Sequence, residues 1–133
     1  MRNQLPAVVA ALQPHGPLLR VVLALAEGAT LGARITAESA ELLGLAPGLP
    51  VLALCKATAV TVARPGAPRP PRANLLAGRA ARVARGDAGD EVAVELPGGL
   101  AMVGFAAPGS GLRAGSAVAL RVDEAAVVIA LPG

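Results

Sequence analysis

The sequence predicts an all-β chain made of two tandem, five-stranded small barrels, the first of which carries one short helix. Three observations support this fold class. The chain repeats itself, because Asn3 and Ser39 recur 71 positions later as Asn74 and Ser110. Short β-prone apolar runs alternate with turns rich in glycine and proline. Finally, 54% of the residues are hydrophobic but only one is Phe and none is Trp or Tyr, which predicts a core of small aliphatic side chains.

The second repeat is shorter than the first. After Ser39 and Ser110 the spacing between matching residues falls from 71 to 67, so that Leu45 corresponds to Leu112. Each repeat has roughly sixty residues, a size at which a hydrophobic core is marginal on its own. We therefore expect the two repeats to need each other or another chain.

A segment rich in proline and arginine separates the repeats. Its prolines remove hydrogen-bond donors and favour an extended course, so we predict a first domain over residues 1–63, a linker over 64–72 and a second domain over 73–133. The net charge of +3 comes from the linker arginines, and the repeats themselves are nearly neutral. Since no aromatic platform accompanies these arginines, direct binding of nucleic acid is not expected.

Five strands and one helix are predicted in the first repeat. The helix covers residues 36–44, where Thr36 provides a hydroxyl N-cap and Gly44 ends the helix. The strands are expected at residues 7–12, 18–25, 30–35, 51–54 and 60–62. Five strands with a helix after the third is the order of an OB-fold, so the barrels are expected to be OB-fold-like.

The second repeat keeps the strands and loses the helix. Its strands are expected at residues 78–84, 91–96, 100–106, 117–122 and 126–130. Residues 107–111, Ala-Pro-Gly-Ser-Gly, contain too much glycine for a stable helical turn. We therefore expect a loop at this position.

Four short segments carry a resemblance to a known family. They are RNQLP at 2–6, ITAES at 35–39, LGLAPG at 43–48 and KATAV at 56–60. In this order they resemble the molbindin or TOBE family of small OB-fold modules that bind molybdate and tungstate, over essentially the whole chain. The decayed second repeat is more similar to the paired sensing domains at the C-terminus of molybdate-dependent transcription regulators than to storage molbindins.

The resemblance implies a set of oxyanion ligands in the first repeat. The family positions are occupied by Arg2, Thr36, Ser39 and Lys56, with Ser110 and Ala57 as weaker candidates. The resemblance also places such a site at a domain or subunit interface, so self-association is expected, most simply as a dimer. In the second repeat the first, second and fourth ligands are replaced by Ala73, Ala107 and Asp123. We therefore expect the second repeat to support assembly and to form no full site of its own.

These residue types suit a tetrahedral dianion. The two cations, Arg2 and Lys56, would balance its charge, while Thr36 and Ser39 would donate hydrogen bonds from a helix start, where free N–H groups favour anions. Each residue alone also has an ordinary structural interpretation, as an N-cap, a solvated lysine or a chain end. Only their joint occurrence with the tandem barrel pattern favours an oxyanion site.

The remaining chemistry-bearing residues carry no site. His15 and Cys55 lack companions at ligand spacing, so both are interpreted as structural and no bare metal site is expected. Asp87, Asp90 and Glu91 are interpreted as a solvated turn. Nothing resembles a nucleophile with its base, a phosphate loop or a paired-carboxylate site, so neither an enzyme nor a cofactor is expected.

The sequence thus predicts a binding protein for molybdate or tungstate that acts in molybdenum sensing, homeostasis or storage. We expect it in the cytoplasm, because neither a signal peptide nor a membrane span is present in the sequence and the single cysteine is compatible with a reducing compartment. One alternative is a structural or regulatory TOBE di-domain of a molybdate importer or regulator, with weak or no anion binding. Nucleic-acid binding on an OB-fold is the less favoured alternative.

Overall fold

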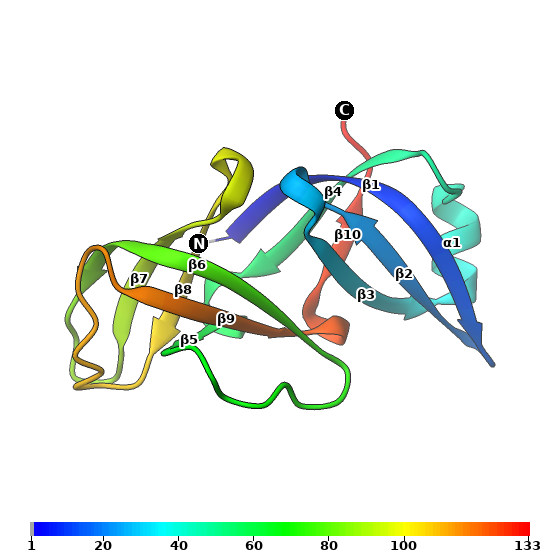
Figure 1. Cartoon of the computed structure of the whole chain (residues 1–133). Coiled ribbons are helices and arrows are strands. Elements are labelled where there is room, and N and C mark those ends of the chain that lie inside the picture. The colour runs from blue at the N-terminus through cyan, green and yellow to red at the C-terminus, as the bar shows by residue number, and fades with distance from the viewer. Residues whose placement is uncertain (1) are drawn as a thin grey trace.

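The computed structural model describes residues 2–133 as two five-stranded β-sheets packed end to end (Figure 1). The first repeat contains β1 (Arg2–His15), β2 (Leu18–Ala24), β3 (Thr30–Thr36), α1 (Ala37–Leu43), β4 (Pro50–Lys56) and β5 (Thr61–Ala63). The second contains β6 (Ala73–Ala84), β7 (Asp90–Glu95), β8 (Ala101–Ala106), β9 (Ala117–Asp123) and β10 (Val128–Ala130). Short 3-10 turns lie at η1 (Ala26–Gly28), η2 (Ala57–Ala59), η3 (Pro97–Gly99) and η4 (Glu124–Ala126). The predicted fold class, the helix and its loss from the second repeat are confirmed.

The first strand of each repeat begins earlier than predicted, at Arg2 instead of residue 7 and at Ala73 instead of residue 78. Each is long because it pairs with two neighbours in succession. The start of β1 pairs with β4 and its end pairs with β2, with a register shift between Val9 and Ala11 where the strand changes partner. Such a bulge bends a strand and increases its twist, which lets one strand serve both sides of a curled sheet.

The fifth strands are exchanged between the repeats. We expected each repeat to supply all five of its own strands, but β10 pairs with β4, where Val128 lies opposite Leu54. Conversely, β5 pairs with β9 and, in parallel, with β8. The first sheet therefore has the order β10-β4-β1-β2-β3, and the second closes as the barrel β5-β8-β7-β6-β9. The boundaries 1–63, 64–72 and 73–133 delimit the sequence repeats, whereas each sheet takes one strand from the other repeat.

One aliphatic core runs through both sheets, as the composition predicts. Val21 and Leu23 on β2 and their equivalents Val92 and Val94 on β7 are almost completely buried. The exchanged strands contribute to the same core through Val62 and Ile129. The apolar side chains of each fifth strand are thus buried in the sheet of the other repeat.

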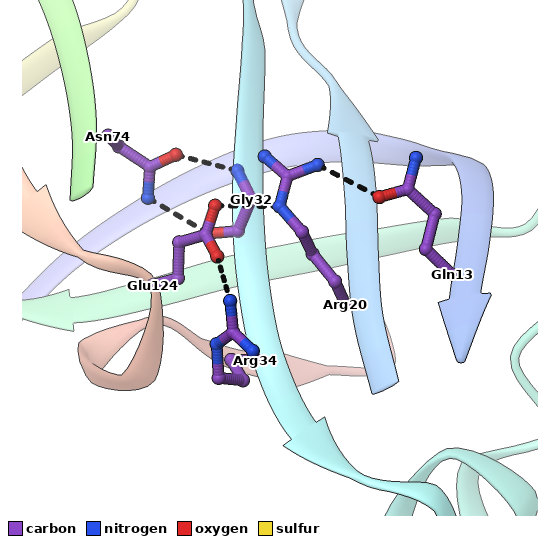
Figure 2. A network of polar contacts seen from close by, with 6 residues as sticks. All are labelled: Gln13, Arg20, Gly32, Arg34, Asn74 and Glu124. Atoms are coloured by element: carbon purple, nitrogen blue, oxygen red, sulfur yellow. Dashed lines mark hydrogen bonds and ion pairs between the residues drawn. The ribbon is translucent and has the colours of Figure 1, made fainter. Parts of the chain in front are cut away.

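Two repeat-equivalent asparagines hold the halves together. Asn3 is buried and its side-chain amide donates to the Val103 carbonyl at 2.9 Å and accepts from the Val103 N–H at 2.8 Å. Asn74 makes the same pair of bonds to Gly32, at 2.9 and 2.7 Å (Figure 2). Each amide acts as a strand partner for the third strand of the other repeat, so the contact is nearly symmetric.

A buried carboxylate adds a contact at only one of these two junctions. Glu124 in η4 is 4% exposed and accepts from Arg20 Nε at 2.7 Å and from Arg34 at 3.1 Å (Figure 2). Both arginines lie on the first sheet, so the ion pairs join η4 to β2 and β3. A Cβ at Gly32 would lie 2.5 Å from Glu124 Oε2, so a larger residue here would displace the Glu124 carboxylate.

Replacing Glu124 by alanine is expected to lower the free energy of unfolding by about 3 kcal/mol, because two partly buried arginines lose their counter-charge. Urea unfolding of wild type and variant measures the difference. Glu95→Ala is the matched control, since Glu95 is exposed and its loss is expected to cost less than about 0.5 kcal/mol. Equal effects of the two substitutions would show that the Glu124 ion pairs do not stabilise the junction.

Candidate anion-binding site

Arg2 and Lys56 lie side by side on neighbouring strands. They are directly opposite partners in the antiparallel pair of β1 and β4, and both are exposed. Opposite residues of an antiparallel pair project from the same face of the sheet, so the two cations face one region of solvent. Together with Leu54, Ala126 and Val128 they line a surface depression at the junction of the two sheets. We call this depression the waist hollow.

Apart from Arg2, the residues that line the waist hollow around Lys56 are uncharged. Cys55 precedes it and is buried, and burial raises the pKa of its thiol, an effect that a hydrogen bond from Asn3 partly opposes. The thiol therefore stays neutral and brings no negative charge to the waist hollow. Ala57 follows as the first residue of η2 and its side chain is buried, so this weaker candidate has no exposed side chain to offer a ligand.

Thr36 and Ser39 form a second polar pair at the start of α1, which we call the first pole. Thr36 is the N-cap of the helix, and its Oγ1 accepts from the Ser39 N–H at 3.0 Å. The same hydroxyl lies 2.8 Å from Ser39 Oγ, and both side chains are exposed. Gly44 ends the helix in the left-handed conformation, with φ of 66°. The predicted caps are confirmed, and α1 leaves two hydroxyls at the surface.

The waist hollow and the first pole lie at opposite ends of the first sheet. Arg2 begins the 14-residue strand β1, whereas His15 at its other end pairs with Leu18, which in turn pairs with Thr36. At about 3.3 Å per residue, the strand separates the two pairs by roughly 40 Å of chain. Figure 1 shows the N-terminus and α1 at the two ends of β1. Within one chain, the four predicted ligands thus form two half-sites.

The second repeat has an equivalent hollow of different charge. This depression is lined by Thr61, Ala73, Arg121 and Asp123 together with alanines 59 and 126. Asp123 occupies the place of Lys56, and the buried Ala73 that of Arg2. A carboxylate in this position opposes an anion, so only the waist hollow of the first repeat carries a pair of cations.

The interpretation of Asp90 as part of a solvated turn is wrong. Asp90 begins β7 and is 1% exposed. Its Oδ2 accepts from Ser110 Oγ at 2.7 Å and from Arg85 at 3.0 Å, and its Oδ1 accepts from the Gly86 N–H at 3.4 Å. Arg85 also donates to the Leu112 carbonyl. These bonds fasten the shortened loop that replaces the helix, which explains why the carboxylate is buried.

A periodicity signal for Asp90 was present in the sequence. Asp90, Val92 and Val94 alternate along one strand, and the repeat equivalent of Asp90 is the buried Leu19. A strand places alternate residues on one face, so Asp90 falls on the inward face. In the structure, the hydrogen bond from Ser110 holds the pKa of Asp90 below its usual value, helped by Arg85 and the Gly86 N–H, while burial acts in the opposite direction.

We expect the Asp90 network to make the fold sensitive to acid. The pKa of Asp90 is lowered on folding, so its contribution to stability is present above the unfolded value of about 3.9 and is lost as the pH falls through the lowered folded value. The melting temperature of the wild type should therefore fall more steeply from about pH 5 to pH 3 than that of Asp90→Asn. Asp87→Asn is the control, since Asp87 is exposed and should follow the wild type. Parallel curves for all three proteins would contradict the prediction.

The other chemistry-bearing residues make no further cluster in the described part of the chain. Among residues 2–133 no group of three or more His, Cys, Asp or Glu side chains is placed to hold a metal ion. His15 is exposed at the end of β1. None of the helices in this range is long and apolar enough to cross a membrane.

Comparison with known proteins shows similarity over the first repeat in sequence and over the whole chain in structure. The TOBE domain family matches residues 1–62. A molybdenum import ATP-binding protein, ModC, of Albidiferax ferrireducens is 50% identical over 58 residues, which are 44% of this chain and 16% of that protein. The cytoplasmic molybdate-binding protein ModG, solved with molybdate bound, superposes with a TM-score of 0.90 at 27% identity, covering 98% of this chain and 96% of that chain. Residues 1–62, in the first repeat, thus match the TOBE domain family, and the whole chain is similar in structure to ModG.

Proposed function

We propose that this protein binds molybdate or tungstate in the cytoplasm and acts in molybdenum sensing, homeostasis or storage as a binding protein and not as an enzyme. The observation that carries this proposal is the placement of Arg2 beside Lys56, exposed together in the waist hollow. Two fixed cations match the charge of a tetrahedral dianion. The similarity of the whole chain to the cytoplasmic, molybdate-binding ModG supports the choice of ligand and compartment.

A complete site needs two chains, because the hydroxyls of the first pole cannot reach the waist hollow of their own chain. We propose that the first pole of one copy docks at the waist hollow of another, most simply in a symmetric dimer with two equivalent sites. Exposed apolar side chains flank both half-sites: Leu42 on α1 is 81% exposed and Val128 beside the hollow is 57% exposed. Their burial would stabilise the contact and keep water away from the oxyanion.

The proposed donor set is sufficient for useful affinity. Hydrogen bonds to a charged group contribute about 1.5–3 kcal/mol each. Four such contacts would come from Arg2, Lys56, Thr36 and Ser39. After the free-energy cost of immobilising the ligand, the remaining binding free energy corresponds to a Kd of roughly a micromolar.

Titration calorimetry with molybdate, and with sulfate as the competing tetrahedral dianion, tests the proposed function. We expect saturable binding of molybdate that sulfate does not reproduce, and a loss of about 100-fold in affinity for Lys56→Ala. Arg121→Ala is the matched control, because Arg121 is an exposed cation in the equivalent hollow and its loss should leave affinity unchanged. Absence of heat from the wild type at millimolar molybdate would reject the proposal.

The second candidate is a structural or regulatory TOBE di-domain with weak or no anion binding. The match of the first repeat to part of an import ATP-binding protein and the charge reversal at Asp123 favour it. A folded, self-associated wild type that binds no molybdate would support this candidate. Nucleic-acid binding is the weaker alternative, tested by adding single-stranded DNA to the same protein.

A further inference from the structure

The two repeat-equivalent serines, Ser39 and Ser110, have different partners. Ser39 is exposed on α1, and among residues 2–133 the one side chain bonded to its hydroxyl is that of Thr36, itself exposed. Ser110 lies in the loop that replaces the helix, and its hydroxyl donates to the buried Asp90 at 2.7 Å while accepting from the Leu112 N–H at 3.2 Å. A serine hydroxyl has a single hydrogen to donate, so the donor of Ser110 is already in use.

The groups around Asp90 are the kinds that bind an oxyanion. A hydroxyl from Ser110, a guanidinium from Arg85 and a main-chain N–H from Gly86 converge on one carboxylate. The equivalent position in the first repeat holds the buried Leu19, which cannot accept a hydrogen bond from Ser39, and Glu38 in the first turn of α1 is exposed. In the second repeat these three groups surround one of its own side chains, and we call them the anion cradle.

We propose that Asp90 is a permanent internal ligand of the second pole, which is the loop at Ser110 that corresponds to the first pole at Thr36 and Ser39. Each chain then offers an oxyanion one open pole instead of two. The part of this inference that concerns binding capacity rests on the proposed function. An external dianion would have to displace a carboxylate that is attached to β7 and therefore present at high effective concentration. It would also meet the negative charge of Asp90 at close range.

The hollow of the second repeat that corresponds to the waist hollow is also unsuited to a dianion. Asp123 stands where the first repeat has Lys56, so neither half-site of the second repeat can take a dianion. Both half-sites of the first repeat remain open. The expected capacity is one molybdate for each chain, whatever the number of chains in the assembly.

The matched variants Ser39→Ala and Ser110→Ala test the proposal in the full-length chain. For Ser39→Ala we expect molybdate affinity to fall about tenfold and the melting temperature without ligand to stay within about 2 °C of wild type. For Ser110→Ala we expect the opposite: unchanged affinity, one molybdate per chain, and a melting temperature lowered by about 5 °C. A capacity of two molybdates per wild-type chain, or a tenfold loss of affinity in Ser110→Ala, would overturn the inference.

A second measurement keeps the inference independent of molybdate. In Asp90→Ala the cradle loses its internal anion, and sodium formate, which restores a carboxylate of suitable size, is expected to raise the melting temperature of this variant more than sodium chloride does at equal ionic strength. Formate should have no such effect on the wild type or on the double variant Asp90→Ala/Ser110→Ala. If the wild type binds no molybdate, the proposed function fails while formate rescue still supports the internal ligand. Equal effects of formate and chloride on Asp90→Ala would reject the anion cradle itself.

Discussion

The isolated first repeat, residues 1–63, is expected to remain unfolded in water at 25 °C. Its sheet would lack β10, which pairs with β4, and its own β5 would have no barrel to join. The fragment would also lose the Asn74 bonds to Gly32 and the ion pairs of Glu124. A domain of about sixty residues has only a few kcal/mol of stability to spare, so these losses exceed what it can tolerate.

Circular dichroism and the dispersion of amide proton signals in NMR measure this outcome directly. A pair of C-terminal truncations provides the control in the whole chain. Ending the chain after Ala130 removes only residues beyond the last strand and should leave the unfolding transition unchanged, whereas ending it after Ala126 removes β10 and should abolish cooperative unfolding. A cooperative transition of the 1–63 fragment would show that the exchanged strands are dispensable.

Because the fifth strands are exchanged, the second repeat forms part of the waist hollow of the first repeat. β10 lies against β4, the strand that ends at Lys56, and Ala126 and Val128 line the waist hollow. The second repeat therefore shapes the surroundings of Arg2 and Lys56 even though its own equivalents of these residues are Ala73 and Asp123. The second repeat thus contributes to the waist hollow through β10, without a pair of cations in its own equivalent hollow.

Local features of the fold could be predicted from the sequence, whereas the partners of the exchanged strands could not. The N-cap at Thr36 and the C-cap at Gly44 depend on residues a few positions away, and both are confirmed. The buried positions Val62 and Ile129 show the same alternation whichever sheet receives their strand. A repeat pattern cannot distinguish a strand that closes its own barrel from one that closes the neighbouring barrel.

The buried carboxylates were missed for a related reason. Acidic residues are mostly exposed, so the sequence predicts a solvated turn at Asp90 and gives no reason to expect a buried carboxylate at Glu124. Both are buried because guanidinium groups from other elements surround them, Arg85 in one case and Arg20 with Arg34 in the other. The pairings of Glu124 span 104 and 90 residues of sequence and leave no mark in local composition, whereas Arg85 is only five residues from Asp90.

The identities of the candidate ligands follow from the motifs, but their arrangement required the structure. Arg2, Thr36, Ser39 and Lys56 occur in family order, which indicates the chemistry and not the distance between the residues. Only the length and pairing of β1 show that the two cations and the two hydroxyls lie at opposite ends of one sheet. Because of this separation, a site that uses all four residues would have to form between chains.

Mixing two inactive variants is expected to restore molybdate binding. Lys56→Ala lacks a cation at the waist hollow but keeps an intact pole, whereas the double variant Thr36→Ala/Ser39→Ala lacks the pole hydroxyls but keeps an intact waist hollow. If a site forms between chains, refolding equal amounts together should give intact sites wherever the waist hollow of the double variant meets the pole of Lys56→Ala. With random association this is about a quarter of all sites.

Calorimetry of the refolded mixture, at a molybdate concentration near the wild-type Kd, measures the recovered capacity. The matched control is a mixture of Lys56→Ala with Arg2→Ala, in which every waist hollow is defective and no capacity should return. Failure of the first mixture to recover, with each variant folded and self-associated and with the wild type binding molybdate, would contradict a site formed between chains. We expect recovery because the 14 residues of β1 separate Arg2 and Lys56 from the first pole of the same chain.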